Sequence, residues 1–440
     1  MKRFMKLLII ISGLALIFIS NSFVHWNDIS DLHVQPPGAG VREEEREPVF
    51  FGLYIVGMEP SANDEEDIGE EYLLVEEPPE NESESDPDPE QYPDSDSNEI
   101  PDTDDALISS YFAQGGLELP IVGASGFAAV SSSLRAEHDN NAEVVLSLSP
   151  GDGFTILDSF GDWWYVQRGE TTGWIRHRYC FINLPDVLPS IIYDITNAHS
   201  SVFRSSGYEI PGVTGIALYQ SFGYNPRFGR EMFIAPAMYG TALKLADAQR
   251  AALANNHTIV LYEAFRPHST QTQVASSLAA LMEENPAVAA GINSPPWNLS
   301  WFISTTLSNH QRGAAVDVSL ARVDNFERRA AGDFEYTYIT NYTILGMPSE
   351  VHELSIRAII YYNPISTTSP TAWIGVPFRT GITQDSAAAI MQRYFTDAGF
   401  TPIASEWWHF NDLASIEIAR SIGTNGRFHI STIYSIPPSR

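Results

Sequence analysis

The stretch SNHQRGAAVDVSL, residues 308–320, holds a histidine and an aspartate seven residues apart. The segment Gln-Arg-Gly-Ala-Ala-Val separates His310 from Asp317. Its small residues, Gly313, Ala314 and Ala315, allow the backbone to turn close to an ion. The VDVSL run that follows is typical of a strand and carries Asp317. A neutral imidazole and a carboxylate are both ordinary zinc ligands. We therefore interpret His310 and Asp317 as two of three ligands to one zinc ion.

A second polar pair, Glu406 and His409, lies in the aromatic stretch SEWWHF. Residues three apart share a face of a helix but lie on opposite faces of a regular strand. The aromatic density favours a strand, so the two side chains need a bulge, a strand end or a turn to converge. The sequence leaves these options open.

Arg266 stands at the end of a buried strand that we predict over HTIVLYEAF, residues 257–265. A guanidinium group there is costly unless it faces a carboxylate, a cleft or water, and Glu263 is a nearby acid. Helical spacing of apolar residues predicts helices over residues 238–256 and 386–399, the second ending at Gly399.

These motifs together resemble a known family. SNHQRGAAVDVSL is similar to the Ser-x-His-x-x-Gly-x-Ala-x-Asp signature of the zinc D-alanyl-D-alanine peptidases, the vancomycin-resistance dipeptidase and carboxypeptidase family. SEWWHF resembles the dipeptidase branch, and EAFRP resembles the Arg-Pro element of the family. The resemblance extends loosely over residues 191–411. It implies an α+β zinc peptidase domain over residues 184–440, with a central antiparallel sheet and flanking helices.

The resemblance also implies a role for each residue of the site. Zinc is expected on His310, Asp317 and His409, with Glu406 as the general base and Arg266 as the transition-state stabiliser. Ser308 is expected to contact the substrate. One region departs from the family, because the acidic Asp-Met-Gly-Thr stretch of the dipeptidases is replaced by LGMPSEVHELS, which lacks the leading Asp. This departure puts the selectivity for dipeptides in doubt.

Short alternating runs separated by turn residues predict a small all-β barrel over residues 106–183. The SLSPGDGFTIL step, the WWYV strand and TTGWI resemble the bacterial Src-homology-three-like domains of wall-associated enzymes. Such domains usually bind wall peptides. The chain has a single cysteine, Cys180, which excludes an internal disulfide and any zinc site with two thiolates. We expect Cys180 to be a small buried residue.

The formal net charge of −30 is concentrated in one segment. Residues 41–105 hold 25 acidic residues and two arginines, a net charge of −23, and residues 1–40 carry a net charge of +1, so the remaining 335 residues carry −8. Rich in Pro and Ser, residues 27–105 cannot bury enough apolar surface to offset their ordering entropy, so we predict a disordered acidic linker. The acidity argues against a nucleic-acid partner, which needs a basic face.

Residues 1–26 begin with three basic residues and continue with an apolar run. This layout is typical of a secretory signal or a signal anchor, and the missing small-residue cleavage site favours an uncleaved anchor. Either segment exports the rest of the chain, so we expect it on the outer side of the cell membrane, associated with the wall, or secreted.

Three functions are consistent with these patterns. The leading hypothesis is an exported zinc peptidase that hydrolyses D-Ala-D-Ala bonds of cell-wall peptides in the manner of the dipeptidases. The first alternative is a D,D-carboxypeptidase that trims peptidoglycan stem peptides. The second is a catalytically inactive wall-binding protein.

Overall fold

The computed structural model describes residues 105–108 and 116–440. The predicted signal or anchor and nearly all of the predicted acidic linker lie outside the described residues. Within the described part of the chain, no helix is both long and apolar enough to cross a bilayer.

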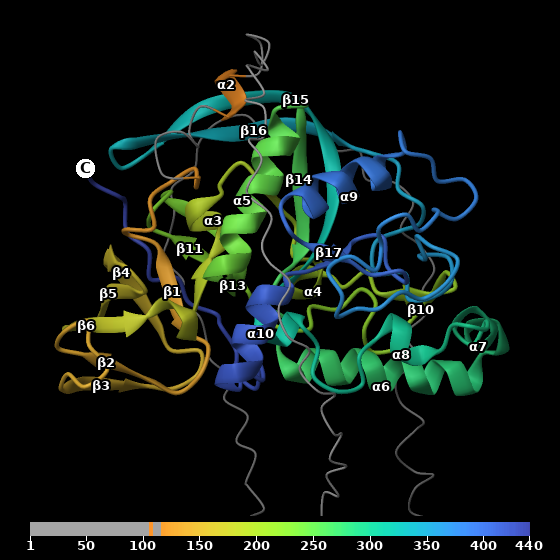
Figure 1. The fold of residues 1–440 in the computed structure, drawn as a ribbon, viewed down its shortest axis with the longest axis horizontal. Coiled ribbons are helices and arrows are strands. Elements are labelled where there is room, and N and C mark those ends of the chain that lie inside the picture. Colours follow the sequence, from red (N-terminus) through yellow and green to blue (C-terminus); the bar gives the residue numbers. More distant parts are fainter. Residues whose placement is uncertain (1–104, 109–115) are drawn as a thin grey trace, which may run out of the picture. The chain divides into compact units, whose positions relative to one another are not determined.

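The strand-rich segment predicted over residues 106–183 forms most of an antiparallel sheet of eight strands (Figure 1). The predicted turns are confirmed, because Gly151, Gly161 and Gly169 all have positive φ angles between strands. The likeness to a Src-homology-three domain stays a prediction. In sheet order the strands are β13 (Pro236–Met238), β7 (Cys180–Asn183), β1 (Ser125–Ala128), β4 (Gly153–Phe160), β5 (Trp163–Arg168), β6 (Thr171–Arg176), β2 (Ser132–Arg135) and β3 (Val144–Leu148).

The pairing of β13 with β7 joins this sheet to the C-terminal part of the chain. Ala237 lies opposite Ile182, so a strand from beyond residue 230 completes the sheet edge. The predicted boundary between residues 183 and 184 stays a prediction, although this pairing crosses it. Cys180, in β7, is fully buried, as expected.

The second sheet carries the candidate site and has the order β17, β18, β15, β14 and β8, with β16 paired to β15. All its pairings are antiparallel except that of β8 with β14, so the central sheet is antiparallel, as expected, with one parallel strand at its edge. The strands are β8 (Ile192–Tyr193), β14 (His257–Glu263), β15 (Ala315–Ala331), β16 (Phe334–Ile344), β17 (Thr401–Pro402) and β18 (His409–Asn411).

Two predicted helices cover this sheet. α5 (Tyr239–Leu253) packs against β14 and α9 (Ala387–Asp397) packs against β15, and the two helices also contact each other (Figure 1). α9 ends before Gly399, whose φ of +84° provides the predicted stop. The predicted strand that follows α5 is also confirmed as β14. Leu245, Leu261 and Phe395 are fully buried between the helices and the sheet.

The remaining elements are helices, 3-10 turns and two short ribbons outside the two large sheets. The longest are α6 (His268–Glu284) and α10 (Leu413–Ile422), which follow β14 and β18 directly. The others are α2 (Asp105–Ile108), α3 (Leu184–Val187), α4 (Thr196–His199), α7 (Pro286–Ile292), α8 (Leu299–Phe302), the 3-10 turns η2 (His177–Tyr179) and η3 (His310–Arg312), and the ribbons β9 (Arg204–Ser205) with β10 (Tyr208–Glu209) and β11 (Phe222–Asn225) with β12 (Arg230–Phe233).

Candidate metal centre

Strand register brings three polar residues of the second sheet side by side. Asp317 in β15 lies opposite Glu263 at the end of β14 and opposite His409 at the start of β18. Side chains of directly opposed residues in an antiparallel pair point to the same face and approach closely. The sheet therefore places Asp317 between the other two, although they are distant in sequence.

A turn brings Glu406 next to His409. The backbone N–H of His409 donates to the carbonyl of Glu406 at 3.3 Å, so the chain reverses just before β18 begins. Trp407 and Trp408, between them, are buried and hold the turn against the core. Of the options left open by the sequence, the structure therefore has the turn at a strand end, and the side chains approach to 3.8 Å between Glu406 Oε2 and His409 Nδ1.

His310 enters the site from the 3-10 turn η3. Gly313 ends that turn with a φ of +64°, a left-handed conformation that glycine adopts without strain. A Cβ atom there would also come within 2.7 Å of the ring of Phe181. The small residue between His310 and Asp317 is therefore required by the close turn, as the sequence indicates.

The ligand atoms of His310, Asp317 and His409 form a nearly equilateral triangle. Nε2 of His310 lies 3.0 Å from Nδ1 of His409 and 3.1 Å from Oδ1 of Asp317, and the third side, from His409 Nδ1 to Asp317 Oδ1, is 3.0 Å. Two ligands of a tetrahedral zinc ion lie about 3.3 Å apart. All three residues are buried. The triangle is thus close to the size that zinc requires.

Hydrogen bonds on the far side of each imidazole fix where its proton lies. Nδ1 of His310 is 2.8 Å from the carbonyl oxygen of Ala264, which can only accept, so Nδ1 carries the proton. Nε2 of His409 is 3.1 Å from Oδ1 of Asn411, an oxygen that also accepts from Asn309, so Nε2 carries the proton there. In the neutral rings the remaining nitrogens have free lone pairs, and both point at the Asp317 carboxylate.

Three acceptors that face one another at 3.0–3.1 Å need a positive charge between them. Burial lowers the pKa of His310, which keeps that ring neutral. Burial also lowers the pKa of His409, but the hydrogen bond and charge of Asp317 outweigh it and raise the pKa. Burial would raise the pKa of Asp317, yet the neighbouring histidines hold it well below its usual range. A proton on His409 or a metal ion supplies the missing charge.

The second oxygen of Asp317 is held by Arg266 and by His352. Arg266 Nη2 donates to Asp317 Oδ2 at 3.0 Å, its Nε donates to Glu263 at 2.6 Å, and its Nη1 donates to Gln271 at 2.9 Å. His352 Nε2 lies 3.1 Å from the same Oδ2 atom. Asp317 therefore offers one oxygen to the ligand triangle while the other oxygen fixes its orientation.

His352 is a residue of the site that the sequence reasoning missed. It is fully buried, stacks on Phe203 at 4.3 Å between ring centroids, and has a φ of +60°. A non-glycine residue held in the left-handed region indicates a position fixed by its surroundings. The only signal in the sequence was its place within LGMPSEVHELS, where the resemblance breaks down, and no regular spacing links it to Asp317.

A cavity of about 270 Å³ opens onto the ligand triangle. Burial raises the pKa of Glu406, in its wall, to about 8. Ser308 also lines the cavity, and its hydroxyl accepts from the backbone N–H of His310 at 3.3 Å, so it supports the turn as well. Five of the six predicted site residues line the cavity, namely Arg266, Ser308, His310, Glu406 and His409. The sixth, Asp317, lies directly behind them.

The donor set fits zinc. Two imidazole nitrogens and one carboxylate oxygen are a common set for a catalytic zinc site, and each imidazole donates its other N–H to an oxygen, as metal-bound histidines almost always do. Glu263, Asp317 and His352 also converge, but Arg266 contacts both carboxylates and supplies the positive charge there. The first triangle is therefore the better candidate for a metal ion.

The fold and the site define a mixed α+β protein with a candidate metallopeptidase centre. Residues 234–422 match the model of a peptidase family described as D-ala-D-ala dipeptidase. The matched range includes all six predicted site residues and His352, and it supports a peptidase of this type. No curated protein gives a significant match to the chain.

Proposed function

We propose that the chain is a zinc-dependent peptidase that hydrolyses D-Ala-D-Ala bonds of cell-wall peptides. The observation that carries the proposal is the convergence of three buried lone pairs, from His310, Asp317 and His409, at a cavity that also contains a carboxylate of raised pKa. These residues would hold a zinc ion, which would supply a Lewis acid to activate water and polarise the scissile carbonyl.

Glu406 acts as the general base. Burial raises the pKa of its carboxyl to about 8 without a metal ion, so this group holds a proton more strongly than an ordinary carboxylate. It lies beside the ligand triangle, so its carboxylate accepts a proton from the attacking water and then passes it to the leaving amine. No serine or cysteine nucleophile is needed for this reaction.

Arg266 stabilises the negative charge that develops on the carbonyl oxygen. Its bonds to Glu263, Gln271 and Asp317 use three of its five N–H groups and hold the guanidinium plane rigidly in the cavity wall. Because these partners hold Arg266 in place before substrate arrives, no reorganisation is needed during the reaction. Donors of this kind typically contribute about 10²–10³ in rate.

A D,D-carboxypeptidase is the second candidate, and one observation favours it. Among the residues that line the cavity, Glu406 is the only acidic one. A dipeptidase has to bind the free ammonium group of its substrate, and the lining offers no second carboxylate for this purpose. A longer stem peptide has no ammonium group at that place, so it fits the lining better.

The test is product analysis with the purified full chain. We expect one equivalent of bound zinc, release of D-alanine from a pentapeptide that ends in D-Ala-D-Ala, and loss of activity with a chelator. Free D-Ala-D-Ala, assayed in parallel, separates the two enzymatic candidates. A His310→Ala variant should lose the zinc. Wild-type protein that holds zinc but cleaves neither substrate would instead support a wall-binding protein.

The place of action follows from the N-terminal segment. The predicted anchor or signal would put the catalytic domain on the outer side of the membrane, where peptidoglycan peptides are present. A protease-protection experiment on intact spheroplasts tests this part, since an exported domain is digested and an internal one is protected.

A further inference from the structure

We propose that a cleft of about 750 Å³ between the strand-rich segment and the end of α10 binds the free carboxylates of uncrosslinked peptidoglycan. The inference rests on the proposed function and deepens it, because it makes a polymer-borne stem peptide, rather than a free dipeptide, the substrate. It is carried by the composition of the cleft, the way its arginines are held, and its link to the metal centre.

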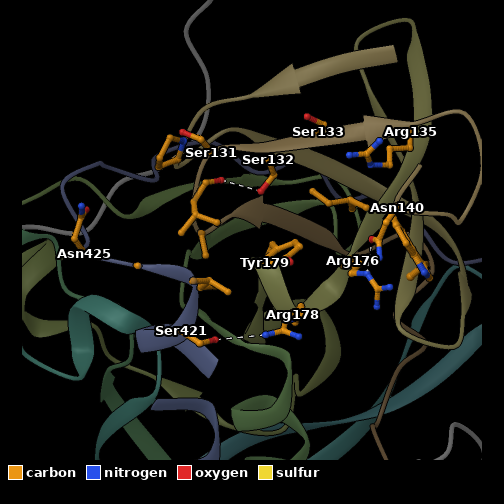
Figure 2. Close-up of a pocket in the computed structure, with 17 residues that line it drawn as sticks. Ser131, Ser132, Ser133, Arg135, Asn140, Arg176, Arg178, Tyr179, Ser421 and Asn425 are labelled. Atoms are coloured by element: carbon orange, nitrogen blue, oxygen red, sulfur yellow. Dashed lines mark hydrogen bonds between the residues drawn. The ribbon is translucent and has the colours of Figure 1, made fainter. Parts of the chain in front are cut away.

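The cleft is basic in a strongly acidic protein. Figure 2 shows Arg135, Arg176 and Arg178 at the cleft together with serine and asparagine side chains. None of the 17 residues that line it is an aspartate or a glutamate, although residues 106–440 hold 28 acidic residues against 20 lysines and arginines. Three guanidinium groups without a carboxylate in the lining favour an anionic ligand.

Aromatic rings and hydroxyl groups hold two of these arginines in place. Arg176 lies over the ring of Trp163, 4.6 Å from its centroid, and among the described residues its ion-pair partner is Asp162, a mostly exposed residue outside the lining. Arg178 lies over Tyr179 and its Nη2 approaches Ser421 Oγ at 3.4 Å, which connects η2 to the end of α10 (Figure 2). A guanidinium fixed in this way can bind a carboxylate through two parallel hydrogen bonds.

A short basic path leads from the cleft to the metal centre. α10 contacts η2, which lines the cleft, and also η3, which carries His310. Arg420 stands in the last turn of α10, and Arg312 stands in η3. Arg312 in turn donates to Leu307 and Asn309, and both residues line the metal cavity.

α10 begins two residues after Asn411, which lines the metal cavity, and its last residues, Ser421 and Ile422, line the cleft. Ten helical residues span about 15 Å, and five extended peptide residues span about 17 Å. A stem peptide is therefore long enough to reach from the arginines to the metal with its D-Ala end, whereas a free dipeptide is too short. The cleft thus favours the carboxypeptidase candidate.

The experiment measures binding without catalysis. The full chain, with chelator present to stop hydrolysis, is co-sedimented with insoluble peptidoglycan that has been stripped of phosphate polymers. We expect saturable binding that weakens as salt is added, and that is lost when the free carboxylates of the peptidoglycan are blocked by amidation. Binding that survives amidation, or that appears only when phosphate polymers are left attached, would overturn the proposal.

Substitutions of the cleft arginines provide a second test of the binding. Arg176→Gln combined with Arg178→Gln should weaken binding about tenfold or more, because each guanidinium loses a charged hydrogen bond. The matched control, Arg322→Gln with Arg329→Gln, removes two arginines of β15 that lie outside the cleft and should bind as wild type. Equal binding by a folded double variant of the cleft refutes the inference. Binding without hydrolysis would refute the proposed function alone, and hydrolysis without binding would refute the cleft alone.

Discussion

His352 should control the metal affinity of a site to which it contributes no ligand atom. The residue is fully buried and its Nε2 lies 3.1 Å from Oδ2 of Asp317. Because the carboxylate can only accept, His352 is the donor in this bond. Replacing His352 with Leu removes that donor and leaves the oxygen with Arg266 as its remaining partner among the described residues.

The loss of this hydrogen bond gives the expected decrease in zinc affinity. Loss of a hydrogen-bond partner behind a metal ligand typically costs about 10–100-fold in metal affinity, which corresponds to about 1.4–2.8 kcal/mol. Asp317 then rotates more freely, so its Oδ1 atom is less well placed beside the two imidazoles. We expect His352→Leu to bind zinc about 10–100-fold more weakly than wild type.

The assay is competition for zinc against a chromophoric chelator, with circular dichroism to show that each variant is folded. His352→Gln is the matched control, because it keeps an N–H donor. The backbone at this position has a positive φ, and the strain that this causes is similar for Gln and Leu. The comparison of the two variants therefore isolates the hydrogen bond. Equal zinc affinities for folded Leu and Gln variants would refute the reasoning.

Three further outcomes follow from the same contacts. Glu406→Gln should keep its zinc but lose about 10²–10⁴ in kcat, measured by D-alanine release, and a variant of full activity removes Glu406 from the mechanism. Without metal, the native protein binds more protons than the unfolded chain, since burial raises the pKa of Glu406 to about 8 and Asp317, against burial, raises that of His409. Above about pH 6.5 the lowered pKa of His310 no longer opposes these two groups, so stability without metal should fall up to about pH 8. The zinc-induced rise in Tm should grow over the same range, and calorimetry showing a smaller rise at high pH contradicts this. Phe395→Ala, in the core between α9 and the sheet, should lower the free energy of unfolding by about 3–5 kcal/mol in denaturant titrations, and a loss below about 1 kcal/mol would show that the ring is not packed as described.

Sequence reasoning succeeded where the signal is local. The helix over residues 238–256, the strand after it and the helix before Gly399 each show a period that packing on one face requires. The residues of the candidate site were proposed from three short motifs and from their resemblance to a known family. The turn at Gly313 was foreseen for the same reason, since only a small residue fits there.

The parts that could not be predicted depend on contacts between distant segments. The pairing of β13 with β7 and the parallel edge strand β8 involve strands of two to four residues, too short to show a period. His352 lies in irregular chain, and its role exists only because β15 presents Asp317 to it. The arginine cleft likewise joins residues of three distant segments, none of which forms a motif alone.

The position of Asp317 at the centre of three paired strands has a consequence for assembly of the enzyme. Successive residues of a strand face opposite sides, so a shift of β15 by one residue against β18 would turn the carboxylate away from both histidines. A chain with that pairing error would lack the three ligands of the proposed zinc site. Metal binding would then distinguish chains with the native register of β15 and β18 from chains with a shifted one, because only the native register would bind the metal and become active.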